Sequence, residues 1–317
     1  MGIFTELQLL LQLCHTHRSH HSGAITGKQT EAYGTDGWYK VTDGTCHLFY
    51  CKIMHMEKVR DIVTWFMNIF GILNVCKAIT YRKPYGIRVI NYHRTPENEL
   101  ETFEKQLDYF SKHFRDVDFK NFELYKKGEL VLDKPGIMCT FDDGLLNNYE
   151  CALPLLEKYG FTGYFFVSSE KVGKTIDEDS YMSFDQLREV IERGHVVGCH
   201  TATHHRMAES DTEEILKYEI VDSKQKLESE LGDIDIFCWC GGEENTYTQK
   251  AQDVIKNNYN YGFMTNNELV YPDTDNYHIQ RSNVEARFTL TTAKFQICGI
   301  LDKLYEKKRN AVNNKTI

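Results

Sequence analysis

The chain has 317 residues, of which 41% are hydrophobic and 26% charged, enough for one large folded core and an extension. Its formal net charge of -9 provides no broad basic surface, which excludes nucleic acid as an expected partner. Ten cysteines in a chain of this length do not fit a disulfide-stapled miniprotein. Because Cys139, Cys199 and Cys238 lie in apolar, strand-like runs, we interpret them as reduced core thiols in a reducing compartment.

Residues 1–55 show no alternation of strand and helix patterns, and we interpret them as an irregular, disordered extension that catalysis does not need. Four histidines between His15 and His21 lie close to Cys14 and could bind zinc. No Cys-x-x-Cys pair accompanies them, which favours a loosely attached segment over a metal site.

Residues 56–84 predict an amphipathic helix followed by a linker. No charged residue occurs from Ile62 to Cys76, a stretch too short to cross a bilayer comfortably. Apolar residues at helical spacing favour a helix that packs on the next domain, with peripheral membrane contact through residues 56–80 as the alternative. We expect a cytoplasmic protein, or a peripheral membrane or exported one if the true start is Met54 or Met56.

Residues 85–317 alternate between apolar, strand-like runs and helical patterns. The helical patterns carry start and stop signals, such as a capping box at Ser183–Gln186, a second one at Ser210–Glu213, and a glycine after each helix. This alternation favours an α/β barrel, closed or nearly closed, over a sandwich. Seven strands are expected, at 87–92, 136–141, 164–167, 194–199, 234–239, 261–265 and 277–284.

The run 136–144 ends in the sequence Asp142-Asp143-Gly144. In barrels and open α/β sheets, catalytic groups lie where such buried strands end. Successive side chains of an extended chain point in different directions, so one aspartate can bind a metal while its neighbour approaches substrate or water. A plain Asp-Gly surface turn is the alternative interpretation.

A second motif, His200-Thr-Ala-Thr-His204, follows the apolar run 194–199. Two histidines four residues apart share a face if the segment turns helically. Two imidazoles and one carboxylate form a common catalytic zinc set, for which Asp143 could supply the carboxylate. A structural histidine pair is the alternative, and the two motifs together favour the metal site.

Residues 140–144 and 200–204 resemble the first two motifs of the polysaccharide deacetylases, carbohydrate esterase family 4. The resemblance extends over roughly residues 85–290, and Val89–Arg94 and Gly160–Val167 support it. It implies a distorted (β/α) barrel and an enzyme that removes acetyl groups from N-acetylated sugars. The expected partner is therefore an N-acetylated glycan.

The resemblance also implies a role for each motif residue. Asp142 corresponds to the general base. Asp143, His200 and His204 correspond to the ligands of a divalent metal, for which we expect zinc, with cobalt, manganese or nickel as alternatives.

Two parts of the sequence depart from the family pattern. Residues 237–242 lack the proline and the second aromatic of the usual segment, although the N–H of Gly241 could still stabilise an oxyanion, and Trp239 and Arg281 are candidate substrate contacts. The late motif with a histidine general acid is not plainly present. His93, at the end of the first strand, is the candidate acid, ranked above His278.

Two other functions stay open from the sequence alone. Because the third motif and the acid are altered, the barrel could serve as a carbohydrate-binding pseudoenzyme. The same constellation of residues could also hydrolyse another amide or ester. Release of acetate from N-acetylated sugars distinguishes these functions.

Overall fold

The computed structural model describes residues 30–34, 37–41 and 45–315, with side chains from Glu57 onward. The predictions for residues 1–29, including the histidine cluster near Cys14, lie outside the described residues. Contacts divide the chain into two compact units, Met1–Leu73 and Asn74–Ile317.

The first unit contains regular structure where the sequence predicted an irregular extension. Strands β1 (Thr30–Gly34) and β2 (Gly37–Val41) form an antiparallel hairpin. Helix α2 (Thr45–Ile69) begins eleven residues before the expected start at residue 56. The sequence pattern did not predict this hairpin, because its strands are short and polar residues interrupt their apolar positions.

Helix α3 (Ile72–Thr80) follows α2 after a short break that includes Gly71, at φ +71°. No single described helix is long and apolar enough to cross a membrane. The pair Glu57–Ile69 and Ile72–Thr80, bent by 79° at the break between them, is together long and apolar enough to do so. Membrane contact through residues 56–80 stays a prediction.

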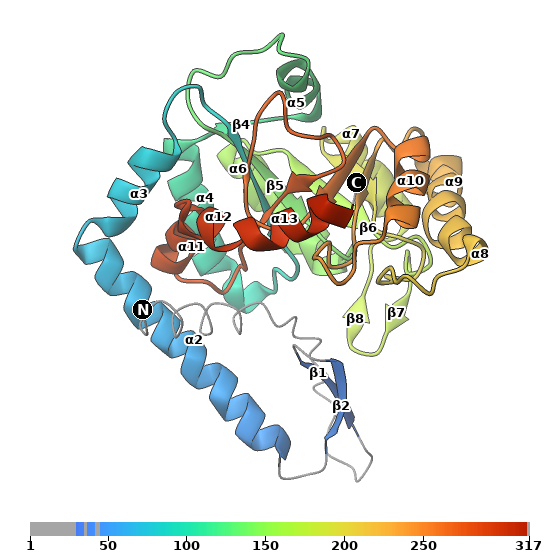
Figure 1. Cartoon of the computed structure of the whole chain (residues 1–317), viewed down its shortest axis with the longest axis horizontal. Coiled ribbons are helices and arrows are strands. Elements are labelled where there is room, and N and C mark those ends of the chain that lie inside the picture. Colours follow the sequence, from blue (N-terminus) through green and yellow to red (C-terminus); the bar gives the residue numbers. More distant parts are fainter. Residues whose placement is uncertain (1–29, 35–36, 42–44, 316–317) are drawn as a thin grey trace. The chain divides into compact units, whose positions relative to one another are not determined.

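The second unit is a nearly closed parallel barrel, and each of the seven expected strands is present within the described residues (Figure 1). The last strand is split at Arg281, with its first half paired to β11 and its second half to β3. This double pairing joins the two edges of the sheet, so the predicted barrel is confirmed. In order around the barrel, the strands are β3 (Ile87–Tyr92), β5 (Gly136–Phe141), β6 (Gly163–Val167), β9 (Val196–Cys199), β10 (Ile236–Cys238), β11 (Tyr261–Met264), and β13 (Ile279–Gln280) with β14 (Ser282–Asn283).

Helices and short strands complete this unit. Helix α7 begins after Ser183, whose side chain forms the expected capping box with Gln186. The second expected capping box is wrong, because Thr212 rather than Ser210 caps α8. The remaining β-strands and α-helices are β4 (Arg115–Asp116), β7 (Thr175–Ile176), β8 (Asp179–Ser180), β12 (Leu269–Val270), α4 (Leu100–His113), α5 (Phe119–Lys126), α6 (Leu153–Tyr159), α7 (Phe184–Glu192), α8 (Glu213–Leu216), α9 (Ser223–Leu231), α10 (Gln249–Asn258), α11 (Leu290–Ile297), α12 (Ile300–Leu304) and α13 (Glu306–Lys315).

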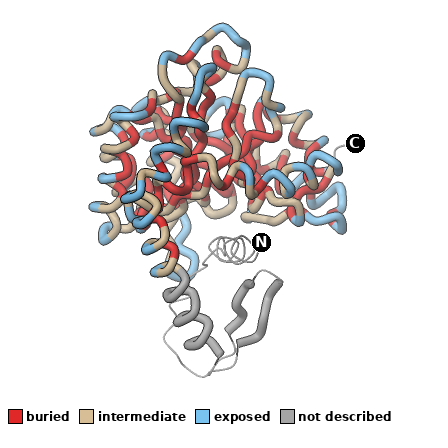
Figure 2. Tube along the Cα trace, turned by 60° about the vertical axis from the view of Figure 1, so that its left-hand side comes forward, coloured by how far each residue is buried: buried red, intermediate tan, exposed pale blue. Residues whose placement is uncertain are grey.

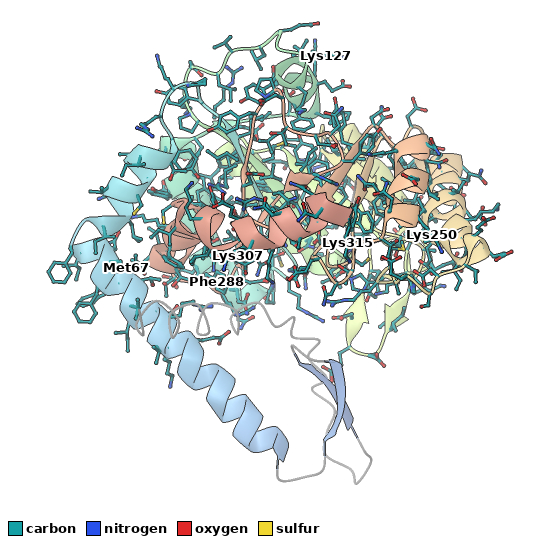
Figure 3. The ribbon with its side chains drawn as sticks, in the orientation of Figure 1. Met67, Lys127, Lys250, Phe288, Lys307 and Lys315 are labelled. Atoms are coloured by element: carbon teal, nitrogen blue, oxygen red, sulfur yellow. The ribbon has the colours of Figure 1, made fainter. Side chains whose placement is uncertain are left out.

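The barrel strands are buried on both faces, which explains their continuous apolar runs (Figure 2). Alternate positions belong to two clusters: Ile137, Cys139 and Phe141 pack with the surrounding helices, whereas Met138 packs with residues of the other strands inside the barrel. Side chains fill the space between the strands and the helices (Figure 3). Since side chains alternate along β5, Asp142 continues the inward row of Met138.

The described cysteines are free thiols, and the three that the sequence placed in the core, Cys139, Cys199 and Cys238, are buried. Burial raises the pKa of Cys139 and of Cys238 well above the usual thiol value. These two side chains are therefore held in the neutral thiol form, as ordinary core cysteines are.

Candidate active site

The sequence motifs meet at the carboxyl ends of parallel strands. Asp142 and Asp143 follow β5, His93 follows β3, and His200 follows β9. The strand register brings the ends of β3 and β5 to one level, and those of β6 and β9 to one level. The motifs thus occupy one rim of the barrel, the end that carries catalytic groups in α/β barrels.

Asp143 lies beside both histidines of the second motif. Its Oδ1 atom is 3.1 Å from Nε2 of His204 and 3.7 Å from Nε2 of His200. The Nδ1 atom of His200 is 2.9 Å from the carbonyl oxygen of Cys238, which makes Nδ1 the protonated nitrogen and leaves Nε2 able to bind a metal. The structure therefore brings together the three residues that the sequence proposed as ligands.

The Asp143 carboxylate is suited to bind a metal. Its Oδ1 atom is buried and receives no well-directed hydrogen bond from the described residues. Burial alone would raise the pKa of Asp143, but His204 and the other nearby imidazoles outweigh burial and hold this pKa well below its usual value. An ionised carboxylate whose Oδ1 atom is buried and faces two imidazole nitrogens fits a divalent cation, since a buried charge without a partner is costly.

The backbone of both motifs adopts a left-handed conformation. The φ angles are +72° at Asp143, +63° at Thr201 and +70° at His204. Such angles cost on the order of 1–3 kcal/mol each for residues other than glycine, and they concentrate at functional sites. The segment from His200 to His204 does not turn helically, because these positive φ angles curl it into a loop. The two imidazole rings still meet, with centroids 5.1 Å apart.

Glu219 anchors this loop, and sequence reasoning missed it. It lies on a π-helical turn, Lys217–Asp222, and is 4% exposed. One carboxylate oxygen accepts hydrogen bonds from the backbone N–H groups of Ala202 and Thr203 at 3.0 and 2.9 Å, and the other accepts from the Thr203 hydroxyl at 2.8 Å. The sequence contained one signal for this role: Glu219 is a charged residue next to the apolar Ile220, within the helical pattern that follows Ser210–Glu213.

We expect Glu219→Gln to weaken metal binding by about 10- to 100-fold, the range typical for residues that orient metal ligands. A glutamine offers one acceptor oxygen where three donors converge, and its NH₂ group would face one of them. Titration of the metal-free variant with zinc measures the effect. Glu214→Gln, an exposed change in the preceding turn, is the matched control and should bind zinc as the unaltered protein does. Equal affinity in both variants would show that Glu219 does not position the loop.

Asp142 is held by Arg281, which occupies the split between β13 and β14. The guanidinium donates to both carboxylate oxygens, at 2.6 Å to Oδ1 and 2.8 Å to Oδ2. It also donates to the hydroxyl of Thr140 at 3.0 Å and to the carbonyl of Met264 at 3.1 Å. Burial alone would raise the pKa of Asp142, but Arg281 and then His200 lower it to about 2. Asp142 is therefore ionised at neutral pH.

The two candidate substrate contacts, Trp239 and Arg281, are both buried. Arg281 is fully buried and its donors point to the groups just described. Trp239 is 1% exposed and packs against Phe237 and Tyr247, with ring centroids 6.2 and 5.3 Å away. These positions support Arg281 as the partner of Asp142 and Trp239 as part of the core beneath the rim, rather than as groups that touch a substrate.

Gly241 fits its position for a backbone reason. Its φ angle is +93°, and an added Cβ would lie 2.8 Å from the hydroxyl oxygen of Thr246. Both features exclude a larger residue there. The contribution of its N–H to an oxyanion stays a prediction.

His93 lies between two carboxylates. Its Nδ1 atom is 3.2 Å from Oε1 of Glu285, and its Nε2 atom is 3.8 Å from Oδ2 of Asp142. Burial alone would lower the pKa of His93, but Glu285 and then Asp142 outweigh burial and raise it to about 9. His278 instead packs edge-on against Tyr247, and burial lowers its pKa. The geometry favours His93 over His278 as a proton donor.

Comparison with known proteins agrees with this fold and site. The family model described as polysaccharide deacetylase matches residues 131–261, which include both motifs. This part of the chain is similar to the polysaccharide deacetylases. Curated relatives match a longer part of the chain, and the resemblance found in the motifs is confirmed.

Two curated relatives and two solved structures illustrate the similarity. The Bacillus subtilis protein YxkH, named as a polysaccharide deacetylase, is 27% identical over 214 residues, which cover 65% of this chain and 74% of that protein. The poly-beta-1,6-N-acetyl-D-glucosamine N-deacetylase of Staphylococcus epidermidis is 26% identical over 241 residues, which cover 65% of this chain and 81% of that protein. IcaB from Ammonifex degensii superposes with a TM-score of 0.60 at 23% identity, covering 69% of this chain and 97% of that one. The Streptococcus pyogenes deacetylase PplD superposes with a TM-score of 0.58 at 19% identity, covering 68% of this chain and 99% of that one. These structural likenesses concern the fold.

Proposed function

We propose that the protein is a metal-dependent hydrolase that removes N-acetyl groups from a poly- or oligosaccharide containing amino sugars. One observation carries the proposal: two adjacent aspartates on one rim have separate partners, Arg281 for Asp142, and His200 with His204 for Asp143. The relative from Staphylococcus epidermidis, named for deacetylation of poly-beta-1,6-N-acetyl-D-glucosamine, supports the substrate class.

Asp143, His200 and His204 would hold the metal. When bound there, a divalent cation supplies Lewis acidity to the acetyl carbonyl and to water. Zinc is the metal that this donor set suits best, because two imidazoles and a carboxylate are a common catalytic zinc set. The buried Asp143 Oδ1 atom without a well-directed hydrogen bond is the structural support for this assignment.

Asp142 would accept the proton of the attacking water. Its carboxylate does not need to serve as a ligand, because Arg281 binds both of its oxygens and fixes their direction. The low pKa keeps this group ionised and thus able to accept a proton across the neutral range. Arg281 is then a positioning residue, and Thr140 and Met264 hold it in turn.

His93 would donate the proton that the departing amine needs. The bond from its Nδ1 atom to Glu285 orients the ring, so that Nε2 faces the same side as Asp142. Its raised pKa means that the imidazole carries this proton at neutral pH. The N–H of Gly241 remains our candidate for stabilising the oxyanion.

The deciding experiment measures acetate release from a panel of N-acetylated oligosaccharides, before and after chelation and after zinc is added back. We expect release that chelation abolishes and zinc restores. Full activity after verified removal of metal would overturn the proposed chemistry. Binding of glycan without acetate release would favour the pseudoenzyme, and release only from non-sugar amides or esters would favour a different hydrolase.

A further inference from the structure

Cys240 lies against the two histidines of the proposed metal site. It follows β10 and is buried, with 2% of its surface exposed. Ligand atoms of His200, His204 and Cys240 all lie within 4.8 Å of one another. A cluster of two imidazoles and one thiol is a donor set that zinc binds in proteins.

A second cluster among the described residues contains Asp142, His200 and Cys238. This second cluster is not a suitable set of metal ligands, because two of its members already have other partners. Both oxygens of Asp142 hold the Arg281 guanidinium, and Nδ1 of His200 contacts the Cys238 carbonyl. Cys240 is therefore the cysteine whose sulfur lies near ligand atoms that remain available.

Local structure holds the Cys240 side chain in this place. Its Sγ atom is 3.6 Å from the carbonyl oxygen of His200 and 3.6 Å from the hydroxyl oxygen of Thr201. The two glycines that follow, with φ angles of +93° and +70°, turn the chain immediately after it. The sulfur is thus fixed against the loop that carries both histidines, rather than free to rotate into solvent.

We propose that the Cys240 thiolate is a further protein ligand of the metal held by Asp143, His200 and His204. The inference rests on the metal site of the proposed function and extends it with a sulfur donor. A thiolate is a soft ligand, so it shifts the preference of the site toward zinc and cobalt and away from manganese. A zinc site with four protein ligands can still admit substrate or water by expanding to five-coordination.

The test uses the full chain, freed of metal and titrated with Co²⁺. Sulfur bound to Co²⁺ produces an intense charge-transfer absorption in the near ultraviolet. Nitrogen and oxygen ligands do not produce this absorption. We expect this absorption in the unaltered protein, its loss in Cys240→Ser, and its retention in Cys238→Ser, the matched control two residues away. Zinc affinity should fall roughly 10-fold or more in Cys240→Ser only, as judged from the range for residues around metal sites.

The outcomes separate this inference from the function on which it rests. Co²⁺ bound without the sulfur absorption, or with an absorption that Cys240→Ser leaves unchanged, would overturn the role of Cys240 and leave the three-residue site intact. Failure of the unaltered protein to bind Co²⁺ or zinc at all would overturn both. X-ray absorption of the zinc form provides a second readout, because a Zn–S distance of about 2.3 Å must be present if the inference holds. Thermal unfolding of each variant verifies that the fold is retained.

Discussion

Asp142→Asn is expected to lower the rate of acetate release by about 10² to 10⁴-fold, the usual cost of removing a general base. The amide cannot accept the proton of the attacking water, while its size is nearly that of the carboxylate. Metal content should stay unchanged, because Arg281 and not the metal occupies the Asp142 oxygens. Steady-state kinetics and metal analysis of the purified variant measure both quantities.

Asp143→Asn is the informative comparison, since it makes the same chemical change, carboxylate to amide, at the adjacent aspartate. It should lose metal affinity first, and activity as a consequence, so added zinc should restore part of the rate. If Asp142→Asn loses the metal instead, the roles of the two aspartates are exchanged. An undiminished rate in Asp142→Asn would make this residue structural and would favour a glycan-binding function.

Arg281→Met is expected to destabilise the protein by about 3–5 kcal/mol, the cost of leaving one member of a buried ion pair without its partner. Asp142 is 3% exposed and Arg281 is fully buried, so water cannot replace the lost guanidinium. Urea unfolding followed by circular dichroism measures the change. The activity should fall as well, because the Asp142 carboxylate loses the contacts that direct it.

A double-mutant cycle tests whether the loss comes from the unpaired carboxylate. Adding Asp142→Asn to Arg281→Met removes the buried charge, so the double variant should be more stable than Arg281→Met alone. Arg188→Met is the control, because Arg188 pairs with Asp185 at the surface and its loss should cost at most about 1 kcal/mol. Asp142→Asn alone completes the cycle, and a double variant whose loss of stability equals the sum of the two single losses would show that the pair is not coupled.

The barrel and the position of its motifs were predictable because they depend on local patterns. Strands buried on both faces require continuous apolar runs, and parallel strands require helices between them, so the alternation in residues 85–317 predicts both. The pairing of the split last strand with β11 and β3 was not predictable from such runs. Strands β1 and β2 and the first part of helix α2 were not predicted, since a short hairpin has little apolar periodicity.

The roles of several polar residues depended on contacts far apart in the chain. Arg281 was predicted to touch substrate, but it is 139 residues from the aspartate that it binds, and no spacing rule connects the two. Glu285 lies 192 residues from His93, its partner in the structure. Glu219 reads in the sequence as one more charge on a helix, and only the packing of that helix against the loop 200–204 makes it an anchor.

The sequence by itself determined which side chains can perform the chemistry, because Asp142, Asp143, His200 and His204 are identified by residue type and by position after apolar runs. The resemblance to a known family already implied a separate role for each aspartate, but only the folded chain supplies the contacts that separate them. It pairs Asp142 with a buried guanidinium, turns Asp143 toward two imidazoles, and places Cys240 beside them. The reason is physical: a carboxylate becomes a base or a ligand according to the charges that burial brings against it, and closure of the barrel determines those neighbours.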